Sequence, residues 1–194
     1  MEQHVHNIDV ANWALQSHPE KALGVGGRQV RTDPSYGHIF DHFGIEFVYP
    51  NGARIFSVCR QQEGTPSRVG EHLVGTKGTT DGHSKIEGET DWAYDGEDVN
   101  PYVQEHADLI ASIRAGDPLN EGQRVAESVL TAIMGREAAY TGQEVTWDDV
   151  LNADLKLVPD RFAFGSMPFP EVAQPGTTEL NRSLVDQTAA SADA

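Results

Sequence analysis

The stretch HIFDHFGIEFVYPNGARIFSVCR, residues 38–60, decides the centre of the fold. Its two halves, 38–49 and 53–60, have the pattern of strands, and Pro50-Asn51-Gly52 between them predicts a hairpin turn because Asn-Gly tolerates positive φ. Successive side chains of a strand point to opposite faces. One face of the second strand carries Ile55, Ser57 and Cys59, and the other carries Arg54, Phe56, Val58 and Arg60. Neither face is wholly polar, so we expect this hairpin to lie inside a larger sheet.

Further strands are predicted on both sides of the hairpin. Residues 21–27 have the pattern of a strand loosened by glycines. Short strands are expected at 71–74, around 79–86 and at 91–94, and a turn at 75–78 joins the first two of them. Together these segments predict a mainly antiparallel sheet.

Helices are predicted before and after the strands. Between residues 2 and 16, a spacing of about 100° per residue groups Val5, Ile8, Ala11 and Leu15 on one side. A second helix follows Asn100-Pro101 and ends at Gly116; its apolar stripe is Val103, His106, Ile110 and Ile113. A third covers about 121–140 and ends near Gly142; its stripe is Val125, Val129, Ile133 and Met134. A short helix begins at 147, with Thr146 as its N-cap.

The length of 194 residues suits one ordinary domain. We place that domain at residues 1–159. Residues 162–175 are rich in proline and aromatic side chains and predict an irregular strap, whereas 176–194 have the composition of a disordered tail. We therefore treat 160–194 as a separate terminal segment.

Composition excludes several classes of function. The net charge is −16 with only 14 Lys and Arg, which argues against a nucleic-acid surface because phosphates need clustered cations. No stretch approaches the roughly 20 apolar residues of a membrane span, so we expect no membrane partner. The single cysteine, Cys59, excludes an intrachain disulfide. The N-terminus lacks the features of a signal peptide, which predicts a cytoplasmic location for the chain as given.

The first predicted helix carries the most specific chemistry. His6 lies four residues after Glu2 and three before Asp9, spacings that put all three on one face. A carboxylate beside an imidazole fixes its tautomer and raises its basicity, which suits a general base acting on a sugar hydroxyl. The alternative is a solvated polar face with no role in catalysis.

Three other acid-histidine pairs follow along the chain: Asp41-His42, Glu71-His72 and Glu105-His106. They do not form a metal motif, because neighbours on a strand or helix point in different directions. His38, Asp41 and His42 could contribute oxygen and nitrogen ligands. Local hydrogen bonding is the alternative for these strand histidines, and we predict no metal site.

Residues 26–31, GGRQVR, end the strand at 21–27 with flexible backbone and two guanidinium groups. This suits either an anionic ligand or the edge of an interface, and both interpretations stay open. The glycine spacing fits neither the phosphate-binding P-loop nor the dinucleotide motif G-x-G-x-x-G, and no βαβ unit surrounds it. The sequence therefore predicts no nucleotide site in this chain.

Several stretches in a fixed order resemble the C-terminal domain of the Gfo/Idh/MocA oxidoreductases, especially a bacterial type. The resemblance covers most of the chain up to about Pro159. The matching segments are VHNID (5–9) with Trp13, GGRQV (26–30), YG (36–37), FDHF (40–43), YPNG (49–52), GTKG (75–78), NPYVQEH (100–106), NEG (120–122), AIMGR (132–136), YTG (140–142) and VTW (145–147).

The resemblance implies an α+β fold: an open-faced, mainly antiparallel mixed β-sheet with helices packed on one face. The family's D-x-x-x-H pair is matched by Glu2 and His6, with Glu in place of Asp. His6 is then the candidate general base and Glu2 its partner. Asp9 would lie in the same substrate-facing cluster, and further candidate substrate-binding residues are Arg28, His42 and His106.

The family's N-terminal nucleotide-binding domain has no counterpart in these residues. The complete enzyme would use NAD or NADP, whereas for this chain alone we expect no cofactor, no nucleotide binding and no turnover. The chain starts inside a motif, which suggests a gene fragment, an excised domain or a truncated start. Whether it counts as an enzyme by itself is therefore left open.

The leading hypothesis is a substrate-binding and oligomerisation domain of a nicotinamide-dependent oxidoreductase acting on a sugar or cyclitol. Its sheet face would form a homodimer or higher oligomer. The alternative is a free-standing, non-catalytic carbohydrate-binding or dimerisation module. A third possibility is elimination or hydrolysis begun by oxidation, as the resemblance allows.

Overall fold

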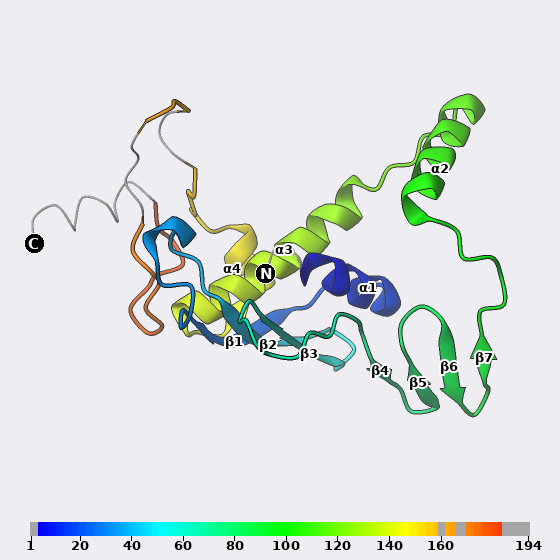
Figure 1. Cartoon of the computed structure of the whole chain (residues 1–194), viewed down its shortest axis with the longest axis horizontal. Coiled ribbons are helices and arrows are strands. Elements are labelled where there is room, and N and C mark those ends of the chain that lie inside the picture. The colour runs from blue at the N-terminus through cyan, green and yellow to red at the C-terminus, as the bar shows by residue number, and fades with distance from the viewer. Residues whose placement is uncertain (1–3, 159–161, 166–169, 184–194) are drawn as a thin grey trace, which may run out of the picture. The chain divides into compact units, whose positions relative to one another are not determined.

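The computed structural model describes residues 4–158, 162–165 and 170–183. The chain divides into two compact units (Figure 1). Residues 1–67 together with 128–194 form the first, and residues 68–127 form the second.

A four-stranded antiparallel sheet, here called sheet A, forms the centre of the first unit. Its strands are β1 (Lys21–Gly27), β2 (His42–Val48), β3 (Arg54–Arg60) and β8 (Val145–Thr146), in the order β3-β2-β1-β8. The predicted hairpin and the strand at 21–27 are confirmed. The strand predicted from residue 38 begins only at His42, because residues 38–41 belong to a loop that includes the short 3-10 helix η2 (Pro34–Tyr36).

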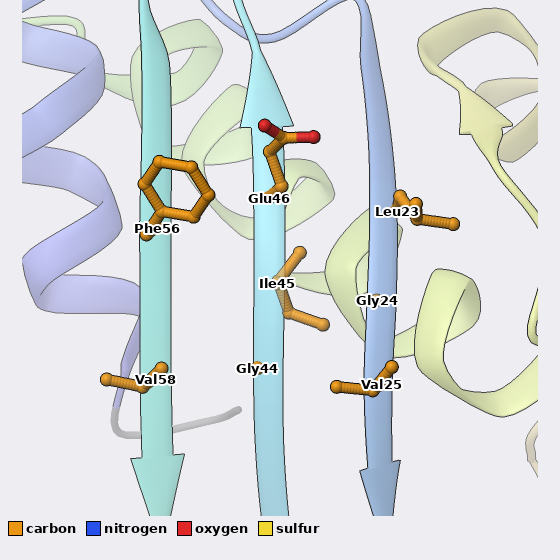
Figure 2. Close-up of a pocket in the computed structure, with 8 residues that line it drawn as sticks. All are labelled: Leu23, Gly24, Val25, Gly44, Ile45, Glu46, Phe56 and Val58. Carbon is orange, nitrogen blue, oxygen red and sulfur yellow. The ribbon is translucent and has the colours of Figure 1, made fainter.

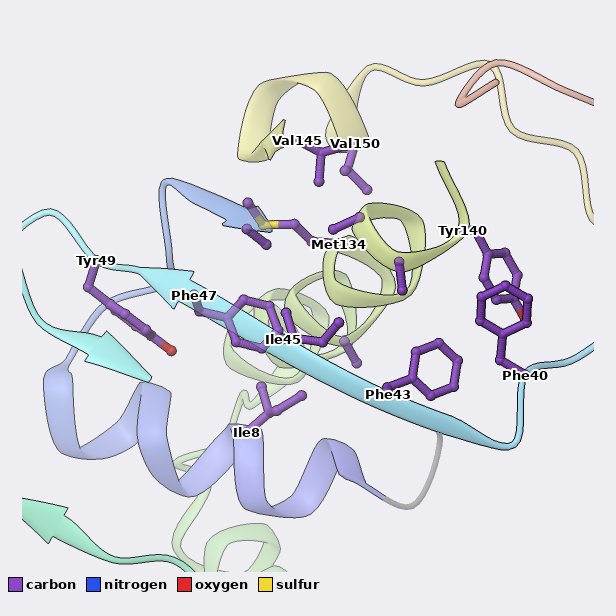
Figure 3. Close-up of a cluster of buried hydrophobic side chains, with 14 residues drawn as sticks. Ile8, Phe40, Phe43, Ile45, Phe47, Tyr49, Met134, Tyr140, Val145 and Val150 are labelled. Carbon is purple, nitrogen blue, oxygen red and sulfur yellow. The ribbon is translucent and has the colours of Figure 1, made fainter. Parts of the chain in front are cut away.

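One face of sheet A carries the core (Figure 3). Phe43, Ile45 and Phe47 of β2 are buried there with Ile8 of helix α1 (Val5–Leu15) and Met134 of helix α3 (Gly122–Thr141). Helix α4 (Trp147–Leu151) adds Val150 and begins with a capping box from Thr146, the predicted N-cap. Helices therefore cover one face of an open sheet, and the predicted fold class is confirmed.

The inward face of α3 differs from the predicted stripe. Met134 is fully buried, but Val125 and Val129 are 48% and 44% exposed. The buried face of the helix instead consists largely of small or polar side chains: Ser128, Thr131, Ala132, Gly135, Glu137, Ala138, Ala139, Tyr140 and Thr141. The prediction was wrong here because hydrogen bonds and ion pairs satisfy the buried polar groups, which hydrophobic periodicity cannot detect.

The unit at 68–127 has its own small sheet and one complete helix. Strands β4 (Leu73–Val74), β5 (Gly78–Thr80), β6 (Lys85–Gly88) and β7 (Trp92–Ala93) pair in that order. The single sheet expected from the sequence is thus divided into two. Helix α2 (Pro101–Ala115) begins at Pro101 and ends at Gly116 as predicted, and the side chain of Asn100 caps its N-terminus. No side chain of residues 68–127 is buried, and the apolar stripe of α2 is exposed.

The described residues near the C-terminus pack within the first unit. Val172 and Ala173 pack against the core, and Lys156 forms a β-bridge with Ser183. The rest of the predicted tail, 184–194, lies outside the described residues. Among the helices described, none is long and apolar enough to cross a membrane.

Candidate functional site

Helix α1 is fixed to the core by a buried polar network. The side-chain amide of Asn12 donates to the hydroxyls of Ser128 and Thr131 of α3 at 3.5 and 3.2 Å. The hydroxyl of Tyr49, just after β2, donates to Asn12 Oδ1 at 2.6 Å. Burial raises the pKa of Tyr49 well above its ordinary value, so this hydroxyl remains a donor. The network fixes the rotation of α1 about its axis.

The predicted acid-histidine cluster on α1 is only partly described. His6 is exposed in the first turn of the helix. Asp9 accepts a hydrogen bond from Ser128 Oγ at 2.6 Å, so its carboxylate is engaged with α3. Glu2 lies outside the described residues. His4 lies one turn before the buried Ile8, and its Nε2 atom is 3.0 Å from Ser57 Oγ. This contact connects the start of α1 to β3.

Asp41 and His42 form a carboxylate-imidazole pair where β2 begins. Asp41 Oδ1 lies 2.8 Å from His42 Nδ1, and Oδ2 accepts the backbone N–H groups of Gln29, Val30 and Arg31 at 2.6–2.9 Å. Burial alone would raise the pKa of Asp41, but these amides and His42 outweigh it and hold the pKa well below its ordinary value. The charged carboxylate therefore fixes both the loop at 29–31 and the His42 ring.

His42 lies on the face of sheet A opposite the core, between Gly27 of β1 and Arg60 of β3. A Cβ atom on Gly27 would lie 3.2 Å from its ring, so glycine leaves room for the imidazole. With Nδ1 facing a carboxylate, Nε2 is the atom left for a further partner. This geometry gives the predicted binding residue a defined orientation.

Arg28 stabilises the loop that follows β1. Its guanidinium donates to the backbone carbonyl oxygens of Arg31, Asp33 and Gly37. The structure thus uses these donors internally, a role that the sequence did not predict. Arg28 remains a candidate for binding through its charge.

His106 belongs to the unit at 68–127. Its ring lies 2.7 Å from the carbonyl oxygen of Tyr102, one turn earlier in α2, and the side chain is exposed. His6 lies in the other unit.

The open face of sheet A has a shallow depression of about 270 Å³. Figure 2 shows Phe56 and Val58 of β3, Glu46 of β2, and Leu23 and Val25 of β1 around it. Phe56 is 74% exposed and Val25 72%. Large apolar side chains in contact with water at the centre of a sheet are typical of an interaction surface.

Within the described ranges, no group of three His, Cys, Asp or Glu side chains could hold a metal ion. Three buried residues with polar contacts were not predicted from the sequence: Asn12, Tyr49 and Glu137. The signal for Asn12 was available, because it lies four residues after Ile8 on the apolar side of α1.

The chain is similar in fold to several solved structures. No family model and no curated protein matches the chain. Aldose-aldose oxidoreductase from Caulobacter crescentus, complexed with glycerol, superposes with a TM-score of 0.59 and 17% identity over 73% of this chain and 45% of that one.

Two further oxidoreductases match similarly. The WlbA dehydrogenase from Bordetella pertussis, in complex with NADH and UDP-GlcNAcA, gives a TM-score of 0.53 at 16% identity, with 74% of this chain and 43% of that one covered. An oxidoreductase from Agrobacterium radiobacter, in complex with NAD+, L-tartaric acid and magnesium, gives 0.53 at 17% identity, with 74% and 47% covered.

The chain shares their fold. These neighbours are oxidoreductases of the Gfo/Idh/MocA type, the group that the sequence resembles. At such low identity the likeness concerns the fold alone. The chain spans less than half the length of each of these neighbours.

Proposed function

We propose that this chain is the substrate-binding and oligomerisation domain of a nicotinamide-dependent oxidoreductase acting on a sugar or cyclitol. Support comes from the fold shared with oxidoreductases, of which two are named in complex with NADH or NAD+ and one with a sugar nucleotide. The observation that carries the proposal is the exposed His6 on a helix that the Asn12 network holds in one orientation.

His6 would act as the general base. A neutral imidazole has a ring nitrogen that can accept a proton. The nicotinamide of the complete enzyme would supply the hydride acceptor for the C–H bond of the alcohol carbon. As that carbon becomes a carbonyl, its hydroxyl O–H bond would break and the proton would move to a ring nitrogen of His6. Glu2 would orient the ring, and Asp9 would add a carboxylate to the same end of α1.

The dinucleotide itself does not fit the residues described. All named strand pairs are antiparallel, so the described segments contain no βαβ unit with a helix N-terminus for the pyrophosphate. NAD or NADP would therefore be held by another domain. The contribution of this chain is the substrate pocket and the proton acceptor.

The open face of sheet A would bind a second copy of the chain. The side chains around its depression are mainly apolar, which suits a protein surface better than a sugar, whose hydroxyl groups need polar partners. A free-standing dimerisation module would use the same face. The two functions differ in whether His6 binds a sugar.

Calorimetry with a panel of aldoses and cyclitols tests this difference. We expect saturable binding of at least one of them, weakened at least tenfold by His6→Gln. His83→Gln is the matched control, because His83 is an exposed histidine of the unit at 68–127. Equal affinities for the wild type and His6→Gln would exclude a substrate role for His6.

A further inference from the structure

His42 and Arg60 form a polar pair at one end of the open face of sheet A. They are direct partners in the antiparallel register of β2 and β3, and His42 also lies opposite Gly27 of β1. Directly opposite residues point to the same face, with Cβ atoms about 4.5–5.5 Å apart. Neither residue lines the apolar depression, which begins at the next pair on that face, Gly44 and Val58. An imidazole and a guanidinium are therefore neighbours beside the apolar surface.

Asp41 fixes the tautomer of the His42 ring. Its Oδ1 atom lies 2.8 Å from His42 Nδ1, while its Oδ2 atom accepts the three loop amides at 29–31. A charged carboxylate can only accept, so Nδ1 carries the proton and Nε2 of the neutral ring keeps its lone pair. Within the described ranges Nε2 has no hydrogen-bond partner, and the side chain is 38% exposed. His42 therefore presents one oriented acceptor to solvent.

Arg60 supplies donors beside this acceptor. One of its terminal nitrogens, Nη2, donates to the carbonyl oxygen of Pro66 at 3.2 Å, and the residue is exposed. Its Nε and Nη1 atoms donate to no protein oxygen in the part of the chain that the structure describes. A second guanidinium, that of Arg31, contacts the next residue, Gln61, at 3.2 Å. Guanidinium N–H groups suit a carboxylate, because a charge-assisted hydrogen bond is roughly twice as strong as a neutral one.

The acids near the pair do not neutralise Arg60. The carboxylate of Asp41 is already bound by the imidazole and the loop amides. Glu46, further along the same face of β2, pairs with Arg54 at 2.7 Å. Glu63, in the loop after β3, is exposed and forms no ion pair with any described residue. Arg60 thus keeps a positive charge for which these residues provide no direct counterion.

We propose that His42 and Arg60 bind a small hydroxycarboxylic acid, with its hydroxyl group on His42 and its carboxylate on Arg60. The hydroxyl would donate to Nε2, and the carboxylate would accept from the guanidinium. A phosphate dianion suits the pair less well, because it offers only acceptors to the lone pair of Nε2. The site lies on the opposite face of sheet A from α1 and does not depend on the role proposed for His6.

Titration with L-tartrate tests the site, with binding followed by calorimetry and the His42 ring by NMR. Succinate is the same diacid without hydroxyl groups, and threitol is the same chain without carboxylates. We expect L-tartrate to bind saturably and to shift the His42 signals, whereas succinate and threitol at the same concentrations leave these signals unchanged. His42→Phe and Arg60→Gln should each weaken the binding of L-tartrate at least tenfold, because each removes one half of the site.

Arg54→Gln is the matched control, because Arg54 lies on the same face of β3 as Arg60 but pairs with Glu46. Its affinity for L-tartrate should match that of the wild type. If a variant of the pair fails to fold, the His42 signals of the wild type still decide the question. The proposal is overturned if these signals respond equally to L-tartrate and succinate or to neither, if the proton lies on Nε2, or if a folded Arg60→Gln variant binds as the wild type does.

Discussion

Replacing Tyr49 by phenylalanine tests the network that holds α1. The change removes only the hydroxyl that donates to Asn12 Oδ1 at 2.6 Å. Tyr49 is 2% exposed and Asn12 8%, so water cannot easily replace the lost donor. A buried acceptor left without its partner costs about 1–3 kcal/mol. We expect the free energy of unfolding to fall by that amount.

Urea unfolding followed by the near-ultraviolet signal of Trp147 measures this change, because Trp147 stacks on His18 within the first unit. Tyr94→Phe is the control: the Tyr94 hydroxyl also donates to an oxygen, the Glu97 carbonyl at 3.1 Å, but the residue is 57% exposed. Its cost should be below about 0.5 kcal/mol. Equal costs for the two substitutions would refute the role given to the buried network.

Three further predictions concern sheet A and its loop. Gly24→Ala should lower the free energy of unfolding in urea by about 1–3 kcal/mol, because the new Cβ would lie 2.5 Å from Ile45 Cδ1 and 3.0 Å from Ala139 N. Gly44→Ala is the control: its Cβ would meet no atom closer than 3.5 Å, so its cost should be far smaller. The pKa of Asp41 is lower in the folded chain than in the unfolded chain, so its charge stabilises the fold above the unfolded pKa. This stabilisation is lost as the pH falls toward the pKa of the folded state. Below about pH 4 the free energy of unfolding of the wild type should therefore fall more steeply with pH than that of Asp41→Asn. Phe56→Lys should raise the dissociation constant of a homodimer at least tenfold in sedimentation equilibrium, whereas Val69→Lys, an exposed change in the other unit, should not.

The sequence predicted the parts of the fold whose patterns are regular. Alternation identified β3, and Pro101, Gly116 and Thr146 marked helix ends that the structure confirms. These short strands were predicted, but not that they form a sheet of their own, because strands of two to four residues with exposed or half-buried side chains carry little register information.

The candidate site was predictable only where local spacing determines it. His6 was found from its spacing on one helix. Asp9 contacts Ser128, which lies 119 positions away, and Glu137 contacts Arg182, which lies 45 positions away. No local sequence pattern reveals such contacts. The Asp41-His42 pair was visible as a dipeptide, but its three amide donors depend on how the loop at 29–31 folds.

The most direct test of the central claim is to titrate the purified chain with NADH and with aldoses and cyclitols, and to follow the His6 ring by NMR. The account predicts that at least one polyol shifts the His6 signal saturably, while NADH alone leaves the spectrum unchanged. Saturable binding of NADH to this chain, or a His6 signal indifferent to every polyol, would contradict a substrate domain that leaves the dinucleotide to another domain.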